Sequence, residues 1–244
     1  MVLPFFNHKS VETLTKVDIH SHLIPNIDDG AKDIEDSIAL IKELTLLGYE
    51  KLITTPHISD MFCNTKEQIL KGYHILKEEL LRRGIDVEIE VAAEYYVDDH
   101  FETLLEKEEL LTFGEEKYLL IEFSYFTPPY DLENLIYDIL LKGYKPVLAH
   151  PERYLYWHQN FKKYRELKEE MGVLFQVNIN SLNRYSNEMV YQTAESFIRK
   201  GMVDFVGSDT HHMKHIKNLK RSFNESLYKK IFQQNSILND SLTT

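Results

Sequence analysis

Pro146-Val147-Leu148-Ala149-His150-Pro151-Glu152-Arg153 is the segment from which the rest of the fold follows. Its apolar residues predict a short buried strand, and the polar residues after Ala149 mark the place where that strand ends. Apolar runs that end in a histidine, glutamate, aspartate or asparagine recur along the chain. Because the carboxyl ends of parallel strands open on one face of a sheet, we expect these polar side chains to gather there.

The pattern occurs seven times, and a stretch with helical spacing of apolar residues follows each strand. The predicted strands are residues 17–20, 51–55, 87–92, 118–123, 146–149, 174–177 and 204–206. The predicted helices run from the N-cap Asp33 to Gly48, and over 66–83, 97–107, 132–141, 161–170, 187–200 and 219–232. The last residues, 233–244, are polar enough that we expect them to fray.

Four of these strands are nearly continuous in apolar residues, which is typical of a parallel sheet covered on both faces. A barrel and a doubly wound sheet both meet that condition. The barrel is favoured because candidate ligands follow six of the seven strands, and a closed ring brings all of those ends together. We therefore predict an α/β barrel as one domain over 1–244, with its core at about 17–232. A chain of 244 residues that is 43% hydrophobic can bury such a core.

Composition argues against several classes of protein. No run of about 18 apolar residues is present and residues 1–9 lack a secretory signal, so we expect a cytoplasmic protein without membrane insertion. The formal charge of -11 repels a phosphodiester backbone, which argues against a nucleic-acid partner. The single cysteine, Cys63, excludes an internal disulfide.

The residues at the strand ends are of the types that bind metal ions. His20 and His22 lie two positions apart, so both imidazoles point to the same side of their strand. The other candidates are acids and histidines that follow further strands: Asp28, Asp29, His57, Glu94, Glu122, His150, Asp209 and His211. Burying so many ionisable groups together costs several kcal/mol per ion unless cations compensate. Imidazole and carboxylate ligands without thiolate suit manganese, iron or zinc better than calcium or a structural zinc.

Each candidate also has an ordinary structural explanation. Glu122 fits a buried carboxylate paired with an arginine, and His57 after Pro56 fits a turn. Asp28 or Asp29 fits an Asx turn or a helix cap. Together, these explanations would gather charged groups at one end of the sheet without a compensating ion, so a metal cluster is the better hypothesis.

Arg153 stands three residues after His150, where its guanidinium would reach a metal-bound phosphate through two parallel hydrogen bonds. The alternative is a salt bridge with an acid such as Glu152. Six aromatic residues follow the fourth and fifth strands: Tyr125, Phe126, Tyr130, Tyr154, Tyr156 and Trp157. They would form a rim for an aromatic substrate or would pack the loops, and packing is the commoner role of such residues.

The motifs at the strand ends resemble those of the PHP superfamily and, within it, the CpsB/YwqE-type bacterial protein-tyrosine phosphatases. The resemblance runs in order from about Val17 to His212. It rests on Asp18-Ile19-His20-Ser21-His22, Ile27-Asp28-Asp29-Gly30, Thr54-Thr55-Pro56-His57, Ala93-Glu94-Tyr95-Tyr96, Leu120-Ile121-Glu122-Phe123-Ser124, Ala149-His150-Pro151-Glu152-Arg153-Tyr154, Gln176-Val177-Asn178 and Ser208-Asp209-Thr210-His211.

The resemblance implies a distorted seven-stranded (β/α)7 barrel of the TIM type. It implies a centre of three divalent cations, with manganese expected first and iron or zinc as alternatives. It also implies removal of phosphate from tyrosines of a bacterial tyrosine kinase that controls capsule or exopolysaccharide synthesis, with inorganic phosphate as the product.

Carried over residue by residue, the resemblance assigns the metal ligands and the phosphate site. The ligands would be His20, His22, Asp29, His57, Glu94, Glu122, His150, Asp209 and His211. Arg153 would hold phosphate, and Asp29 is chosen over Asp28 by alignment to Gly30. The chain departs from the family pattern after His211. Relatives tend to carry another arginine there, for which this sequence offers Lys214, Lys217 or Arg221.

Other functions are compatible with the same residues. One is a small-molecule phosphomonoesterase of the histidinol-phosphatase type, which would have a narrower pocket. Another is a metal-binding regulatory partner of the kinase, against which the complete ligand set argues. A PHP-type exonuclease is opposed by the acidic charge balance. Thiol chemistry is improbable because a cysteine phosphatase needs an arginine six positions after its cysteine, and Ile69 stands there after Cys63.

Overall fold

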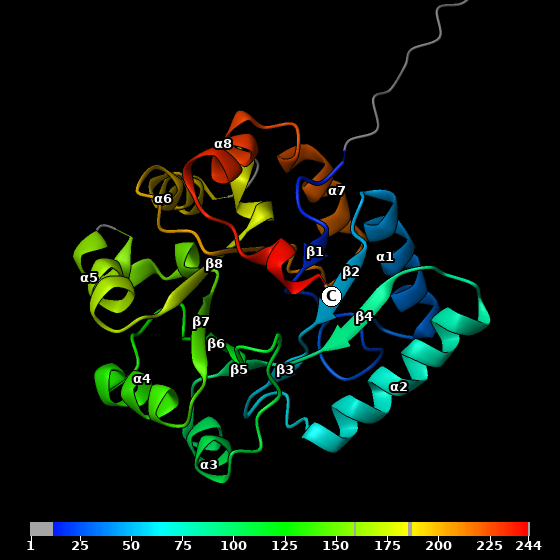
Figure 1. Cartoon of the computed structure of the whole chain (residues 1–244), viewed down its shortest axis with the longest axis horizontal. Helices are drawn as coiled ribbons and strands as arrows, with labels where there is room; N and C mark the ends of the chain where they lie inside the picture. The colour runs from blue at the N-terminus through cyan, green and yellow to red at the C-terminus, as the bar shows by residue number, and fades with distance from the viewer. Residues whose placement is uncertain (1–11, 159, 185–186, 244) are drawn as a thin grey trace, which may run out of the picture.

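The structure is a computed structural model that describes residues 12–158, 160–184 and 187–243. Residues 1–9, for which the sequence predicts no secretory signal, lie outside the described part. Figure 1 shows strands at the centre of the molecule and helices arranged around them.

The described chain contains every strand that the sequence predicts. In chain order the strands are β1 (Val17–Asp18), β2 (Lys51–Thr54), β3 (His57–Ile58), β4 (Glu88–Val91), β5 (Glu94–Tyr96), β6 (Tyr118–Glu122), β7 (Lys145–Ala149), β8 (Leu174–Asn178) and β9 (Phe205–Gly207). The short strands β3 and β5 are additional. They carry His57 and Glu94, which the sequence places just beyond a strand end.

Helices follow the strands, and the N-cap predicted at Asp33 is confirmed because its side chain accepts a hydrogen bond from the backbone N–H of Asp36. The α-helices are α1 (Ile34–Leu46), α2 (Lys66–Arg82), α3 (Asp99–Lys107), α4 (Leu132–Leu141), α5 (Phe161–Arg165), α6 (Glu188–Arg199), α7 (Met213–Ser222) and α8 (Ser226–Gln234). Shorter helical segments are η1 (Pro151–Arg153), η2 (Leu155–Trp157), the π-helical η3 (Glu166–Glu170), η4 (Ile179–Leu182) and η5 (Asn239–Leu242).

The last predicted helix differs from the structure. The sequence predicts one helix over 219–232, but α7 begins at Met213 and a turn separates it from α8. Phe223 lies in that turn, is 5% exposed, and packs its ring 4.7 Å from the ring of Tyr228. The turn is therefore held by tertiary packing, which helical spacing in the sequence does not report.

The strands form two parallel sheets, in the orders β1-β2-β4 and β3-β5-β6-β7-β8-β9. The boundary between the sheets lies at Pro56, which has no N–H to donate to a ladder. Backbone hydrogen bonds continue across it: Ala92 donates to Thr54 at 2.9 Å, and Glu94 donates to Pro56 at 3.1 Å. The segment that contains β2 and β3 and the segment that contains β4 and β5 thus each run from one sheet into the other.

The first and last strands of the chain, which belong to different sheets, are followed by segments in direct contact. Ser21 and Thr210 form an isolated parallel bridge. The backbone N–H of Asp209 donates to the carbonyl of His20 at 2.8 Å. This contact brings the residues after β1 and β9 to the same place.

Burial agrees with a parallel sheet covered on both faces. All residues of β2, β6 and β9 are buried, as their nearly continuous apolar sequences predict. Within the described residues, no helix has the length and apolar composition needed to cross a membrane.

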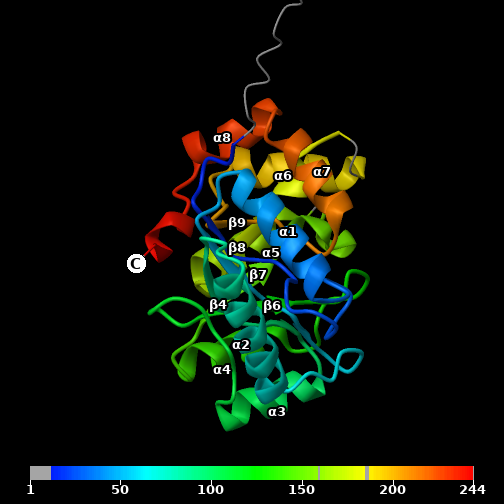
Figure 2. The same cartoon turned by 90° about the vertical axis from the view of Figure 1, so that its right-hand side faces the viewer.

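The C-terminal residues are more ordered than the sequence predicts. They return to the central strands, where η5 packs against β1 (Figures 1 and 2). Asn239 has no exposed surface, and its side-chain amide donates to the carbonyls of Val17 and Val206 at 2.8 Å each. The side-chain oxygen of Asn239, Oδ1, accepts from the backbone N–H of Val206 at 3.0 Å. The expectation of fraying is wrong for the described residues 233–243, because one amide pairs with backbone groups of both β1 and β9; residue 244 lies outside the described part of the chain.

We expect Asn239→Ala to lower the free energy of unfolding by about 2–4 kcal/mol, because each buried polar group left without a partner costs about 1–3 kcal/mol. Chemical denaturation would measure the change. Asn134→Ala is the matched control, since Asn134 is exposed and should change the stability by less than about 0.5 kcal/mol. Equal stabilities for the two variants would contradict this account of the C-terminal segment.

Candidate metal centre

His20 and His22 follow β1 and face the same space. Ser21 between them is buried, and its hydroxyl donates to the carbonyl of Ile53 at 3.2 Å, so the two histidines share the opposite side of the extended chain. Their Nε2 atoms are 3.4 Å apart, and neither residue has exposed surface. The spacing in the sequence predicted this shared direction.

Glu94, the first residue of β5, lies at the centre of the histidines. Its carboxylate is fully buried and lies 3.1 Å from His20 Nε2, 3.0 Å from His150 Nε2 and 3.2 Å from His57 Nδ1. Burial alone would raise the pKa of this carboxyl, but the charges of His20 and His57 outweigh burial and hold the pKa of Glu94 well below its usual range.

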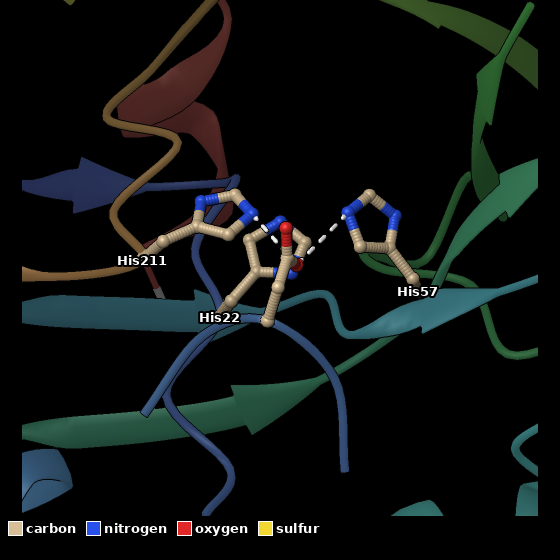
Figure 3. Close-up of side chains that lie close together, drawn as sticks. His22, His57 and His211 are labelled. Atoms are coloured by element: carbon tan, nitrogen blue, oxygen red, sulfur yellow. Dashed lines mark ion pairs between the residues drawn. The ribbon is translucent and has the colours of Figure 1, made fainter. Parts of the chain in front are cut away.

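A second group of side chains surrounds Asp29. Its Oδ1 is 3.3 Å from His211 Nε2 and 3.6 Å from His57 Nε2. The ring centroids of His22 and His211 are 3.8 Å apart. Figure 3 shows the imidazoles of His22, His57 and His211 converging from separate segments of the chain.

The neighbouring Asp28 has a different position. Its Oδ2 is 2.8 Å from His22 Nδ1 and accepts a hydrogen bond from the backbone N–H of His57 at 3.1 Å. A carboxylate on the far nitrogen of a histidine fixes the orientation of the ring. Gly30 permits the turn, because a Cβ at this position would overlap the carbonyl oxygen of His22. Asp29 therefore faces the other candidate ligands, while Asp28 supports one of them.

The carboxylate of Asp209 lies close to both His20, which follows β1, and His211, which follows β9. Its Oδ1 is 3.5 Å from His20 Nε2 and 3.3 Å from His211 Nδ1, and its Oδ2 accepts from Asn178 at 2.7 Å. Burial raises the pKa of this carboxyl, but the opposing charges, that of His20 first, lower it below its usual value.

Glu122 ends β6, and its pKa is shifted in the direction opposite to that of Asp209. Burial, followed by the charge of Glu94, raises the pKa of Glu122 to about 8. The hydroxyl of Tyr125 donates to Glu122 Oε1 at 2.5 Å, and His150 Nε2 lies 3.6 Å from the same oxygen. Burial lowers the pKa of His150 to about 4, so its imidazole is neutral, as a metal ligand must be.

Arg153 reaches the cluster from η1. Its Nη1 donates to Asp209 Oδ2 at 3.1 Å, and its guanidinium lies 4.7 Å from the centre of the Tyr125 ring. The expected alternative, a salt bridge with Glu152 or another acid, is therefore confirmed for another acid, Asp209, and not for Glu152. The buried Glu152 instead accepts hydrogen bonds from the Ser181 hydroxyl and the Asn178 N–H.

Two of the candidate ligands have strained backbone. His150 has φ of 32° and Asp209 has φ of 49°, in the left-handed region that residues other than glycine seldom occupy. Such conformations cost on the order of 1–3 kcal/mol and concentrate at functional sites. His150 directly follows β7, and Asp209 follows β9 after Ser208; at both points the chain turns to aim the side chain into the cluster.

Gln176 and Asn178 support the cluster from β8, a role that the sequence analysis did not assign. Gln176 Oε1 is 2.7 Å from His20 Nδ1, and Gln176 Nε2 donates to Asn178 Oδ1 at 2.8 Å. A Cβ at Gly207 would lie 2.7 Å from both Gln176 and His20, so glycine makes room for this contact. Two amides that alternate in an apolar strand were the available signal, since they share the inner face.

The cluster opens into a cavity of about 680 Å³. Beyond the candidate ligands and Arg153, the cavity is lined by Ser59, Asp60, Met61, Phe62, Tyr96, Asp98, Tyr125, His212 and His215. Of the aromatics considered for a rim, only Tyr125 is among these residues, while Tyr154 and Trp157 pack in the core. After His211, the residues that line the cavity are His212 and His215 rather than Lys214, Lys217 or Arg221.

The donor set fits divalent cations. Four groups of side chains have potential ligand atoms within 4.8 Å of one another: His22, Asp29, His57 and His211; His20, Glu94 and His150; His20, His22 and Asp209; His57, Glu94 and Glu122. All nine predicted ligands belong to these groups. Among the described residues, the buried Nδ1 of His150 has no hydrogen-bond partner. Cys63 is exposed and belongs to none of the groups.

Comparison with known proteins places this arrangement in a family. Residues 16–238 match the family described as capsular polysaccharide synthesis, CpsB/CapC. Tyrosine-protein phosphatase YwqE of Bacillus subtilis is 32% identical over 199 residues, which are 81% of this chain and 78% of the relative. Tyrosine-protein phosphatase CpsB of Streptococcus pneumoniae is 33% identical over 204 residues, which are 81% of this chain and 83% of the relative.

Solved structures agree. A crystal structure from work on YwqE of Bacillus subtilis and CpsB of Streptococcus pneumoniae, described as unique metal-dependent tyrosine phosphatases, superposes with a TM-score of 0.78. It has 29% identity and covers 93% of this chain and 95% of that chain. A phosphotriesterase homology protein of Escherichia coli has a TM-score of 0.52 at 12% identity, covers 90% of this chain and 91% of its own, and shares the fold. The family match over most of the sequence and the two relatives above 30% identity show that this chain belongs to the CpsB/CapC family of capsular polysaccharide synthesis.

Proposed function

We propose that this protein is a metal-dependent protein-tyrosine phosphatase that acts in capsule or exopolysaccharide synthesis. The observation that carries the proposal is the convergence of imidazoles and carboxylates around the buried Glu94, in a cavity that also contains Arg153. The relatives that share this family and about a third of the sequence are tyrosine-protein phosphatases.

We infer that the nine converging side chains hold divalent cations. They are His20, His22, Asp29, His57, Glu94, Glu122, His150, Asp209 and His211. Bound divalent cations would supply positive charge for the phosphoryl oxygens and lower the pKa of water in the site. Three cations would carry six positive charges against four carboxylates, and the excess of two matches a phosphate dianion. The ligand types favour manganese, with iron or zinc as alternatives.

Arg153 is the proposed phosphate-binding residue. A guanidinium has five N–H donors, so the single hydrogen bond to Asp209 leaves donors for an anion. The Tyr125 ring lies against the guanidinium, and the Tyr125 hydroxyl holds Glu122. Tyr125 thus contacts both the proposed phosphate-binding residue, Arg153, and a proposed metal ligand, Glu122.

The proposed fold is a single distorted (β/α)7 barrel domain over residues 1–244. The backbone pairing across Pro56 and the bridge between Ser21 and Thr210 support joining the two parallel sheets into one ring. In that arrangement β2 continues into β3 and β4 continues into β5, so the nine observed strands correspond to seven barrel strands.

The proposed substrate is a phosphotyrosine on a bacterial tyrosine kinase of the capsule pathway, and the product is inorganic phosphate. The charge of -11 disfavours a nucleic-acid partner. We place the reaction in the cytoplasm, where such a kinase would present its phosphorylated tyrosines.

Alanine at His20 or Asp209 is expected to abolish phosphatase activity and to lower the metal content, because each side chain belongs to the converging donors. Elemental analysis of protein purified without chelator, together with a manganese-stimulated phosphotyrosine assay, measures both effects. Cys63→Ala is the control and should change neither, since the thiol is exposed and outside the groups. Full loss of activity in Cys63→Ala would refute the metal-dependent mechanism.

Arg153→Ala is expected to lower kcat/KM by about 10²–10³-fold while retaining bound metal, because it removes a donor to the phosphoryl oxygens and no ligand. Arg153→Lys should recover only part of the loss, since lysine keeps the charge but not the planar fork. Arg165→Ala is a matched control, because Arg165 is exposed and its ion pair with Glu169 is long, at 3.9 Å. Activity of Arg153→Ala equal to that of the control would exclude Arg153 from phosphate binding.

Steady-state assays with manganese should give a higher kcat/KM for a phosphotyrosine peptide than for histidinol phosphate. The cavity of about 680 Å³ accommodates an aryl phosphate together with part of its peptide. The reverse preference would instead identify a small-molecule phosphomonoesterase. No turnover of either compound by metal-loaded protein would favour a regulatory partner of the kinase.

A further inference from the structure

A tight turn beside the cavity exposes apolar side chains in a way that the metal centre does not require. The turn covers residues 59–64, directly after β3, and we name it the Met61 turn. The backbone N–H of Ser59 donates to the carbonyl of Phe62 at 3.1 Å, and the N–H of Phe62 donates to the Ser59 hydroxyl at 3.0 Å. Asn64 N–H donates to the Phe62 carbonyl at 2.7 Å. These bonds close the turn on itself.

The Met61 turn is also attached to other segments. The N–H of Asp60 donates to the carboxylate of Asp98, the N-cap of α3, at 3.1 Å. The side-chain amide of Asn64 donates to the carbonyls of His57 and Ile27, both at 2.8 Å. The turn therefore has a defined shape before any ligand arrives, which reduces the entropy that binding must remove.

The tip of this turn is apolar and lies at the cavity. Met61 is 83% exposed although it lines the cavity wall, and Phe62 lines the same wall. The Phe62 ring is nearly parallel to the imidazole of His57, with 10° between the planes and 5.4 Å between the centroids. An exposed methionine on a constrained turn next to a functional cavity is a typical contact for a partner.

We propose that the Met61 turn is the subsite for the aromatic ring of the substrate and for the residue beside it. The inference rests on the proposed phosphatase function. With the phosphate at Arg153 and the converging ligands, the ester group must pass along the cavity wall to reach solvent. Phe62 would contact the phosphotyrosine ring, and Met61 would contact an apolar neighbour in the substrate chain. In a phosphotyrosine the aromatic ring separates the phosphorus atom from the peptide backbone. With the phosphate at Arg153, that ring would therefore lie along this wall of the cavity.

Two ligands distinguish the Met61 turn from the residues that bind phosphate, namely Arg153 and the converging ligands. The KM of a phosphotyrosine peptide depends on both regions, whereas the inhibition constant of inorganic phosphate depends only on the residues that bind phosphate. We would measure both with metal-loaded wild type, Phe62→Ala, Phe62→Leu and Met61→Ser. Met189→Ser is the matched control, because Met189 is also an exposed methionine, at 46%, but lies on α6 and does not line the cavity.

Phe62→Ala and Met61→Ser are expected to raise the peptide KM by about three- to tenfold, the range of a lost aromatic or sulfur–aromatic contact. The inhibition constant of phosphate and the bound metal should stay within about twofold, and Met189→Ser should match wild type. Phe62→Leu keeps apolar bulk on His57, so it reports on the ring contact if Phe62→Ala loses metal or fails to fold.

Equal changes in the peptide KM and the phosphate constant, or no change in the peptide KM, would overturn the aryl subsite while leaving the phosphatase intact. Absence of phosphotyrosine turnover by the metal-loaded wild type is a separate result. It would refute the proposed function, and the subsite with it.

Discussion

The burial of Glu94 is the constraint on which the rest of the site depends. Its carboxylate has no exposed surface and contacts the imidazoles of His20, His57 and His150. An ionised carboxylate in the protein interior needs nearby positive charge, and here the neighbours that could supply it are themselves titratable, with His20 and His150 buried and His57 partly buried. The pKa of Glu122, raised to about 8 by burial and by Glu94, shows the same shortage of positive charge. Divalent cations would resolve the imbalance for the whole cluster.

The parallel arrangement of the strands brings the candidate ligands together, because the segments that carry them lie at the same end of the sheet. β3 and β5 begin at a candidate ligand and β6 ends at one, while His20, His150 and Asp209 follow the ends of β1, β7 and β9. A second set of polar side chains fixes the orientation of these ligands. Asp28 holds His22, Gln176 holds His20, and Asn178 holds Asp209. The left-handed backbone of His150 and Asp209 shows that the chain accepts local strain to complete the arrangement.

Much of this arrangement was predictable. The strand positions, the cap at Asp33 and the candidate ligands at the strand ends follow from apolar periodicity and residue types, which are local properties of the sequence. The resemblance to a known family reduced those candidates to the nine residues that converge. The split between α7 and α8 and the ordered η5 were not predictable, because they depend on Phe223 packing on Tyr228 and on Asn239 pairing with two strands. The partner of Arg153 was also open, since Glu152 is adjacent in sequence but Asp209 is adjacent in space.

Apolar spacing and residue types were enough to predict that buried parallel strands alternate with helices and that histidines and acids follow the strand ends, because each of these features repeats within a few residues. The resemblance favoured Asp29 over Asp28, and the folded structure shows how the two differ, with Asp29 facing the cluster and Asp28 behind His22. The positions of Tyr125 between Glu122 and Arg153, and of Met61 and Phe62 at the cavity, came from the folded structure alone. Those relations join residues from different strand-helix units, and their distances are set by how the sheets pair and the loops pack, which no local pattern encodes.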